Sequence, residues 1–183
     1  MQRRLQHLKG MSMLLIIQVV AVFLASIAMS LTLAHALELP GKLRLSKENY
    51  IATQTIYYPG FTVGGIGEGL SMVAALALLL LTPTTNPAFW WTLAGFVCLA
   101  AMHAAYWIFT HPVNRFWTRD LNLSAIGAGF FAVGQTQRSE QPSAGSDDRW
   151  MSFRNRWEYS HVLRAVLSAV GLISLIVAVA VRS

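Results

Sequence analysis

The sequence predicts an all-α fold, an integral membrane antiparallel four-helix bundle that forms a single domain over residues 1–183. Hydrophobic residues make up 55% of the chain and charged residues 12%, about half the charged share of a typical soluble domain. The apolar residues form four long runs, without the alternation expected of strands. A run inside hydrocarbon must satisfy its own backbone hydrogen bonds, and a helix does so. This composition excludes a soluble enzyme.

Four stretches are long enough to cross a bilayer, for which a helix needs about 20 apolar residues. They run from Met11 to about Leu37, from Phe61 to Leu81, from about Phe89 to Phe109 and from about His161 to Val181. A proline follows each of the first three stretches: Pro40, Pro83 and Pro112. Because proline has no backbone N–H and breaks helices, we expect the first helix to end at Pro40-Gly41.

A secretory signal is the alternative for the N-terminus. Arg3, Arg4 and Lys9 precede the first apolar run, and Ala34-His35-Ala36 is similar to a small-residue cleavage site. Signal peptides have an apolar core of about 7–15 residues, and this run is longer. We therefore expect an uncleaved first helix.

The first connection, residues 38–60, is predicted to contain a short interfacial helix. Ser46 is a residue type that starts helices, and Tyr50, Tyr57 and Tyr58 follow it. Tyrosines are enriched at the membrane–water interface, so we expect these three at headgroup level.

The other two connections differ in character. Residues 82–88 are uncharged and rich in Thr and Pro, which is typical of a plain turn. Within the long third connection, residues 135–148 are polar, with Ser, Gly and Pro, and are predicted to be a mobile loop.

The net charge of +6 does not indicate a nucleic acid partner, because the basic residues lie beside the apolar runs. Lipid headgroups and topology explain them better. The first and third connections carry nine Lys and Arg residues, against four in the two tails. The positive-inside rule therefore predicts that these connections are cytoplasmic, in a bacterial inner membrane. The basic N-terminal tail favours the opposite orientation. Cys98 is the one cysteine, which excludes a disulfide framework and a cysteine zinc site.

Ionisable side chains within or beside the spans are few, and such groups are costly in hydrocarbon. Antiparallel packing places the ends of the first and third spans on the same side as the starts of the second and fourth. All the ionisable groups fall at these four places: His35, Glu38, Glu68, His103, His111, Glu158, His161 and Arg164. We therefore expect one polar site at this end of the bundle.

Spacing organises these residues further. His35 lies three residues from Glu38, and Glu158 lies three residues from His161, so each pair shares a helix face. Helical periodicity also predicts one stripe on the third span, made of His103, Trp107, Thr110 and Asn114.

Carboxylate–histidine pairs of this kind are also found in di-metal helix bundles. The candidate metal ligands are Glu68, His103, Glu158 and His161, and a bound transition metal is one possibility for the cofactor. A site without any metal is the alternative.

Simpler interpretations stay open for the same residues. His35 and His111 can cap or anchor helix ends, and Glu158 can form an ion pair with a neighbouring arginine. Glu68 can pair with His103. The glycines around Glu68 indicate either close helix packing or room for a flat ligand.

Four segments carry a resemblance to a known family. They are His35-Ala-Leu-Glu38-Leu-Pro40-Gly-Lys42, Tyr57-Tyr58-Pro-Gly60-Phe61, Pro112-Val113-Asn114 and Arg156-Trp157-Glu158-Tyr-Ser-His161. In this order they resemble the DUF1772 family of small four-helix membrane proteins, which includes the anthrone oxygenases. The resemblance covers nearly the whole chain, and its last two segments are the most specific.

The resemblance implies an oxygenase, in which molecular oxygen attacks an activated methylene of a fused phenolic ring and gives a quinone. A positioned base suffices for such an acidic C–H, without a metal. Carried over by motif, the site residues are His35, Glu38, Asn114, Arg156, Glu158 and His161, and position within the apolar runs adds Glu68 and His103.

The resemblance also implies roles for these residues. A His or Glu would be the general base, and Arg156 or Asn114 would stabilise the developing oxyanion. Tyr58, Trp107 and Trp157 would hold the ring system.

Three functions are compatible with these observations. The first is a membrane enzyme that acts with oxygen on a small lipophilic aromatic or quinone-type substrate. The second is a non-enzymatic accessory or assembly subunit of a larger membrane complex, and the third is a small proton-coupled carrier. Four helices without an inverted repeat disfavour the carrier, unless the protein forms a homo-oligomer.

Overall fold

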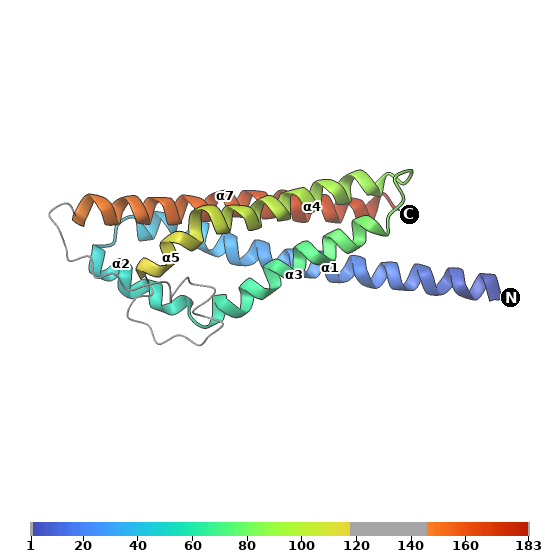
Figure 1. Cartoon of the computed structure of the whole chain (residues 1–183), viewed down its shortest axis with the longest axis horizontal. Helices are drawn as coiled ribbons and strands as arrows, with labels where there is room; N and C mark the ends of the chain where they lie inside the picture. The colour runs from blue at the N-terminus through green and yellow to red at the C-terminus, as the bar shows by residue number, and fades with distance from the viewer. Residues whose placement is uncertain (1, 118–145, 183) are drawn as a thin grey trace.

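A computed structural model describes residues 2–117 and 146–182 (Figure 1). The described part is helical, without strands, which confirms the predicted all-α class. The helices are α1 (Gln2–Lys42), α2 (Lys47–Gln54), η1 (Thr55–Tyr57), α3 (Gly60–Leu80), α4 (Ala88–Ala105), η2 (Tyr106–Thr110), α5 (His111–Trp117) and α7 (Ser146–Ala180). Of the predicted mobile loop, residues 135–145 lie outside the described residues, and residues 146–148 begin α7.

Within the described ranges, four segments are long and apolar enough to cross a membrane, so the chain is an integral membrane protein. They are Met13–Lys42, Gly60–Leu80, Ala88–Asn114 and Arg149–Ala180. Neighbouring spans run in opposite directions, and both chain ends lie at one end of the bundle (Figure 1). The short helices α2 and α5 lie at the opposite end.

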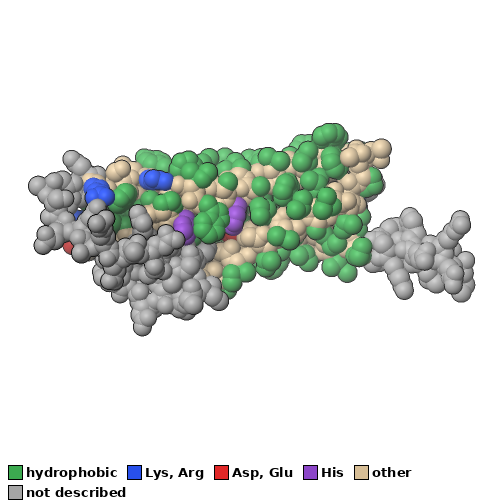
Figure 2. All heavy atoms as spheres, viewed as in Figure 1, with side chains coloured by type: hydrophobic (Ala, Val, Ile, Leu, Met, Phe, Trp, Pro, Cys, Tyr) green, Lys and Arg blue, Asp and Glu red, His purple; other side chains and the backbone are tan. Residues whose placement is uncertain are grey.

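The outer surface of the bundle is apolar. Large hydrophobic side chains such as Ile16, Phe23 and Ile173 are about 60% exposed, and Figure 2 shows a hydrophobic surface along the spans. Inside, small residues such as Ala21 and Ala25 are fully buried. Small inward residues let helices approach closely, and outward apolar ones face lipid.

Helix α1 does not end at Pro40 as predicted but continues to Lys42. Proline removes one backbone N–H, and the regular bonding resumes with Leu43 N–H donating to the Leu39 carbonyl at 3.0 Å. The Lys42 ammonium also lies 2.8 Å from Glu38 one turn earlier, which stabilises the last turn.

Helix α7 begins at Ser146, well before the predicted span start at His161. A search for apolar runs misses its first turns, because they carry Arg and Glu residues, which are good helix formers. Arg156 and Glu158 therefore lie on a helix continuous with the fourth span.

The predicted helix in the first connection is confirmed. The Ser46 side chain accepts a hydrogen bond from the Asn49 N–H at 3.3 Å and caps α2. However, Tyr50 and Tyr57 are buried in the protein, with Trp117 and Trp157 in the same aromatic cluster. Their depth relative to the headgroups stays a prediction.

The third span contains a π-helix, η2, immediately before Pro112. Pro112 cannot donate to the Ile108 carbonyl, the acceptor four residues earlier. Instead, the Arg156 guanidinium on α7 donates to that carbonyl at 2.6 Å. The wider π turn changes the helical register, and Trp107 faces outward while Thr110 and Asn114 face inward. The single stripe predicted for these residues and His103 is therefore wrong.

Glycine allows α4 and α7 to approach closely. A Cβ at Gly95 would lie 2.9 Å from the Leu175 side chain and 3.2 Å from the Gly171 carbonyl oxygen. On α3, Gly67 packs against Ile27 in the same way, which supports the packing interpretation of the glycines near Glu68. Gly69 faces open space.

We expect Gly95→Ala to lower the free energy of unfolding by about 1–3 kcal/mol, because the added methyl overlaps Leu175 and cannot displace the Gly171 backbone. Thermal unfolding of the protein in one detergent measures this change. Gly69→Ala is the matched control and should leave the unfolding temperature unchanged or slightly raised. Equal losses in both variants would contradict the close approach of α4 and α7.

Candidate functional site

A small cavity lies between α1, α3, η2 and α7, toward the end of the bundle that carries α2 and α5. About 30 Å³ of it is open to the centre of a water molecule, enough for about two waters. Its lining residues are Leu31, Thr32, His35, Tyr57, Phe61, Glu68, Tyr106, Thr110, Asn114, Trp157, His161 and Arg164. The cavity therefore accepts a functional group rather than a whole ring system.

The rim of the cavity is apolar. Among its lining residues, Leu31 and Phe61 are partly exposed. All the others, including every polar one, are buried. Leu31 and Phe61 both belong to membrane spans. The partly exposed part of the cavity lining is therefore apolar and belongs to two candidate membrane spans.

A buried ion pair closes the deep side of the cavity. The Arg164 guanidinium lies 2.6 Å from a Glu68 carboxylate oxygen, and each residue is at most 5% exposed. The predicted alternative, a pair between Glu68 and His103, is not what the structure contains. The charge of Arg164 therefore balances that of the Glu68 carboxylate, and the contact holds the Glu68 side chain in place.

The His161 ring is oriented by its own helix. Its Nδ1 lies 2.8 Å from the Trp157 carbonyl oxygen, and a carbonyl can only accept. In the neutral ring the proton is therefore on Nδ1, and Nε2 carries a lone pair. Nε2 has no hydrogen-bond partner among the described residues, and the ring lines the cavity.

His35 packs directly against His161 at the cavity, with their ring centroids 4.2 Å apart. Aromatic rings enclose His35 on its other sides: Tyr57 and Phe61 at 4.5 Å and Trp157 at 4.9 Å between centroids. The two imidazoles therefore lie side by side in a largely apolar enclosure. They come from α1 and α7, more than 120 residues apart in the chain.

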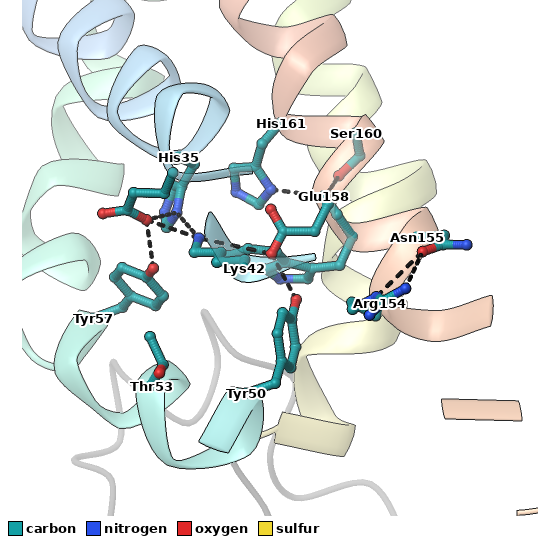
Figure 3. Close-up of polar contacts among 12 residues, drawn as sticks. His35, Lys42, Tyr50, Thr53, Tyr57, Arg154, Asn155, Glu158, Ser160 and His161 are labelled. Atoms are coloured by element: carbon teal, nitrogen blue, oxygen red, sulfur yellow. Dashed lines mark hydrogen bonds and ion pairs between the residues drawn. The ribbon is translucent and has the colours of Figure 1, made fainter. Parts of the chain in front are cut away.

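A charged cluster lies between this pair and α2 (Figure 3). We call it the Lys42 cluster: Lys42, Glu38, Glu158, Tyr50 and Tyr57. Lys42 Nζ lies 2.8 Å from Glu38 and 3.7 Å from Glu158. Tyr57 donates to Glu38 at 2.6 Å and Tyr50 donates to Glu158 at 2.8 Å. The cluster thereby joins the first connection to both histidine-bearing helices.

Burial raises the pKa of the Tyr57 hydroxyl, and its hydrogen bond to Glu38 raises it further. For Tyr50, burial and the nearby Glu158 carboxylate raise the pKa in the same way. Both tyrosines therefore stay protonated donors at neutral pH, where they hold the two carboxylates.

Polar side chains also fix the wall formed by η2 and α5. Trp157 donates from Nε1 to the Asn114 side-chain oxygen at 2.8 Å, and the Thr110 and Ser160 hydroxyls are 2.8 Å apart. Because indole can only donate, this contact sets the direction of the Asn114 amide. Asn114 is 3% exposed.

The structure thus brings His35, Glu68, Asn114, Trp157 and His161 around one cavity. Glu38 and Glu158 lie beside it in the Lys42 cluster. Glu158 does not pair with an arginine side chain, as one interpretation held, but with Tyr50 and Lys42.

Six predicted site residues do not line the cavity: Glu38, Tyr58, His103, Trp107, Arg156 and Glu158. Trp107 is 51% exposed and donates to His103 at 3.1 Å. Arg156 is exposed and bonds the Ile108 carbonyl, so it cannot stabilise an oxyanion in the cavity. In the place predicted for Tyr58, Tyr57 forms the wall.

The candidate metal ligands Glu68, His103, Glu158 and His161 do not converge. Within residues 2–117 and 146–182, no group of three or more His, Cys, Asp or Glu side chains could hold a metal ion. Glu68 is instead bound to Arg164, and Glu158 to Tyr50.

Several residues of the site were missed. The apolar-run pattern predicts no partner for Arg164 and places Lys42 in the first connection. Tyr106 and Thr110 belong to the π-helix η2, and both side chains are buried. The signal that could have found Lys42 is its spacing, since positions 35, 38 and 42 share one face if the helix continues through Pro40.

No protein family model, curated protein or solved structure matches this chain.

We expect Glu68→Leu to lower the free energy of unfolding by about 3–5 kcal/mol, because it leaves the Arg164 charge buried without a counter-ion. The double variant Glu68→Leu/Arg164→Met removes both charges and should recover most of that loss. Unfolding of micelle-bound protein by increasing SDS measures all three proteins. A double variant that is less stable than the single one would contradict the ion pair.

We expect the raised pKa of Tyr57 to be visible in alkaline titration. Between pH 10 and 11 the native protein and Tyr57→Phe should form the same amount of tyrosinate by ultraviolet absorbance, because Tyr57 stays protonated above its ordinary value of 10.0. After unfolding, the variant should form one fifth less, since the chain has five tyrosines. Stability carried by this hydrogen bond is present below pH 10 and falls as the pH rises further. A smaller native amplitude in the variant would show that Tyr57 is accessible.

Proposed function

We propose that this protein is a membrane-embedded, oxygenase-like enzyme that removes a proton from a small lipophilic aromatic or quinone-type compound. The general base is His161. The observation that carries this proposal is the His161 ring, whose Nδ1–H is held by the Trp157 carbonyl while Nε2 is left with its lone pair at an apolar cavity. A base must be oriented and unpaired before it can take a proton.

The remaining lining residues fit such a reaction. Arg164 and the Asn114 amide are polar groups at a cavity whose lining also includes the aromatic rings of Tyr57, Phe61, Tyr106 and Trp157. Fixed dipoles and charges in a water-poor site stabilise a developing oxyanion strongly. In this proposal Asn114 keeps the role that the family resemblance implies, and Arg164 takes the place of Arg156.

The overall reaction balances with oxygen as co-substrate. His161 removes a proton from a methylene beside a ring carbonyl, and the electron pair forms an enolate. The enolate reduces molecular oxygen, the methylene becomes a carbonyl, and the second oxygen atom leaves as water together with the two methylene hydrogens. The resemblance to the DUF1772 family supports this type of reaction for the chain.

The size of the cavity sets how such a compound binds. Because the enclosed space fits about two waters, the reacting group enters the cavity while the rings stay at the rim beside Leu31 and Phe61. Apolar rings are favoured there, since the rim belongs to membrane spans. The compound would therefore arrive from the bilayer.

We also propose a location for the enzyme. The nine basic residues of the first and third connections support cytoplasmic placement of these connections, in a bacterial inner membrane. The cavity would then lie in the half of the bilayer that faces the cytoplasm.

Purified protein in lipid nanodiscs, supplied with anthrone and oxygen, tests the proposal through oxygen uptake and anthraquinone absorbance. We expect His161→Ala to lower kcat by about 10²–10⁴-fold, the usual contribution of a general base. His111→Ala is the matched control, because its ring packs on Trp107 at 4.6 Å, outside the cavity, and it should retain the wild-type rate.

Equal rates in wild type and His161→Ala, at equal thermal stability, would contradict the proposed base. No oxygen uptake by the wild type, together with a large partner that copurifies in mild detergent, would favour an accessory subunit of a membrane complex.

A further inference from the structure

Lys42 is a buried lysine at the end of a membrane span, 4% exposed. Its ammonium has three N–H donors and no acceptor. Three acceptors surround it: Glu38 at 2.8 Å, His35 Nδ1 at 3.4 Å and Glu158 at 3.7 Å. Glu38 and His35 lie within hydrogen-bond reach of the ammonium, and Glu158 adds a longer ion pair.

Aromatic rings hold this ammonium in position. Nζ lies 4.8 Å from the Tyr57 ring centroid and 4.9 Å from that of Trp157, which are distances of cation–π contact. These two rings also contact His35. The lysine and the imidazole are therefore fixed relative to each other by the same two side chains.

The contact between the Lys42 ammonium and His35 Nδ1 determines which nitrogen of His35 carries the proton. Since an ammonium only donates, His35 Nδ1 accepts, and a neutral imidazole then has its proton on Nε2. His161 has the opposite arrangement, because its Nδ1 donates to the Trp157 carbonyl. The competing partner of His35 Nδ1 is the Glu38 carboxylate, at 3.7 Å, which is beyond hydrogen-bond distance.

We infer that Lys42 fixes His35 as a hydrogen-bond donor next to His161, an acceptor, so that the cavity binds one hydroxyl group of its ligand beside the two imidazoles. A hydroxyl oxygen both donates and accepts, and ring centroids 4.2 Å apart bring the two imidazoles to the same small space. This inference rests on the proposed function only for the identity of the ligand. In that reaction Lys42 is a positioning residue, because it acts through His35.

Nitrogen-15 NMR of the full-length protein in nanodiscs, labelled at histidine, tests the inference without any activity. Bare and protonated ring nitrogens resonate at well-separated positions, and His35→Gln and His161→Gln assign the signals. At neutral pH we expect His35 protonated on Nε2 alone and His161 on Nδ1 alone. A wild-type His35 that is protonated on Nδ1, or on both nitrogens, would overturn the inference.

Lys42→Met then tests the cause, since methionine keeps much of the packing against Tyr57 and Trp157. We expect its His35 proton to move to Nδ1, where Glu38 becomes the acceptor. Lys47→Met removes the same charge from the first connection and should leave His35 unchanged. An unaltered His35 in Lys42→Met, or the same change in both variants, would overturn the role of Lys42.

Phenol and anisole, added to the wild type, test the ligand. Phenol donates and accepts, so it should shift the Nε2 signals of both histidines, whereas anisole, which only accepts, should shift His35 alone. Equal effects of the two probes, or none, would overturn the hydroxyl site. Should the expected spectra be obtained but oxygen uptake be absent, the proposed reaction fails while the donor–acceptor pair stands.

Discussion

Hydrocarbon offers no hydrogen bonds, so each polar group that the bundle buries needs a partner from the protein. This constraint explains where the helices touch. Arg164 reaches Glu68 and ties α7 to α3, and Arg156 reaches the carbonyl that Pro112 leaves without a donor and ties α7 to the third span. Lys42 joins both histidine-bearing helices. The cavity lies among these pairings, and its shape depends on all of them.

The fold could be predicted because membrane spans are defined by apolar length, a property that the sequence shows directly. The boundaries could not, for two physical reasons. Apolar length says nothing about where a helix continues as a polar one, as α7 does before His161. A proline also costs only one hydrogen bond, and the ion pair between Glu38 and Lys42 favours continuation beyond Pro40.

The site was predictable where it depended on charge in an apolar run and on up-down topology, which indicated His35, Glu68 and His161. Partners were harder to predict, because they depend on helix rotation. Arg164 rather than His103 faces Glu68, and the π turn moves Trp107 outward. The change of register at the π turn alters which residues of the third span face the cavity. Helical periodicity does not predict where such a turn occurs.

In the proposed function, the apolar residues Leu31 and Phe61 at the cavity determine how binding depends on the concentration of the ligand. A molecule that enters there comes from the fraction dissolved in the lipid. Each added methylene favours its transfer from water to lipid by about 0.8 kcal/mol, which raises its concentration in the membrane roughly fourfold. Occupancy then follows the mole fraction in the membrane instead of the aqueous supply. Extra lipid would dilute the ligand and empty the cavity, even with the total amount unchanged.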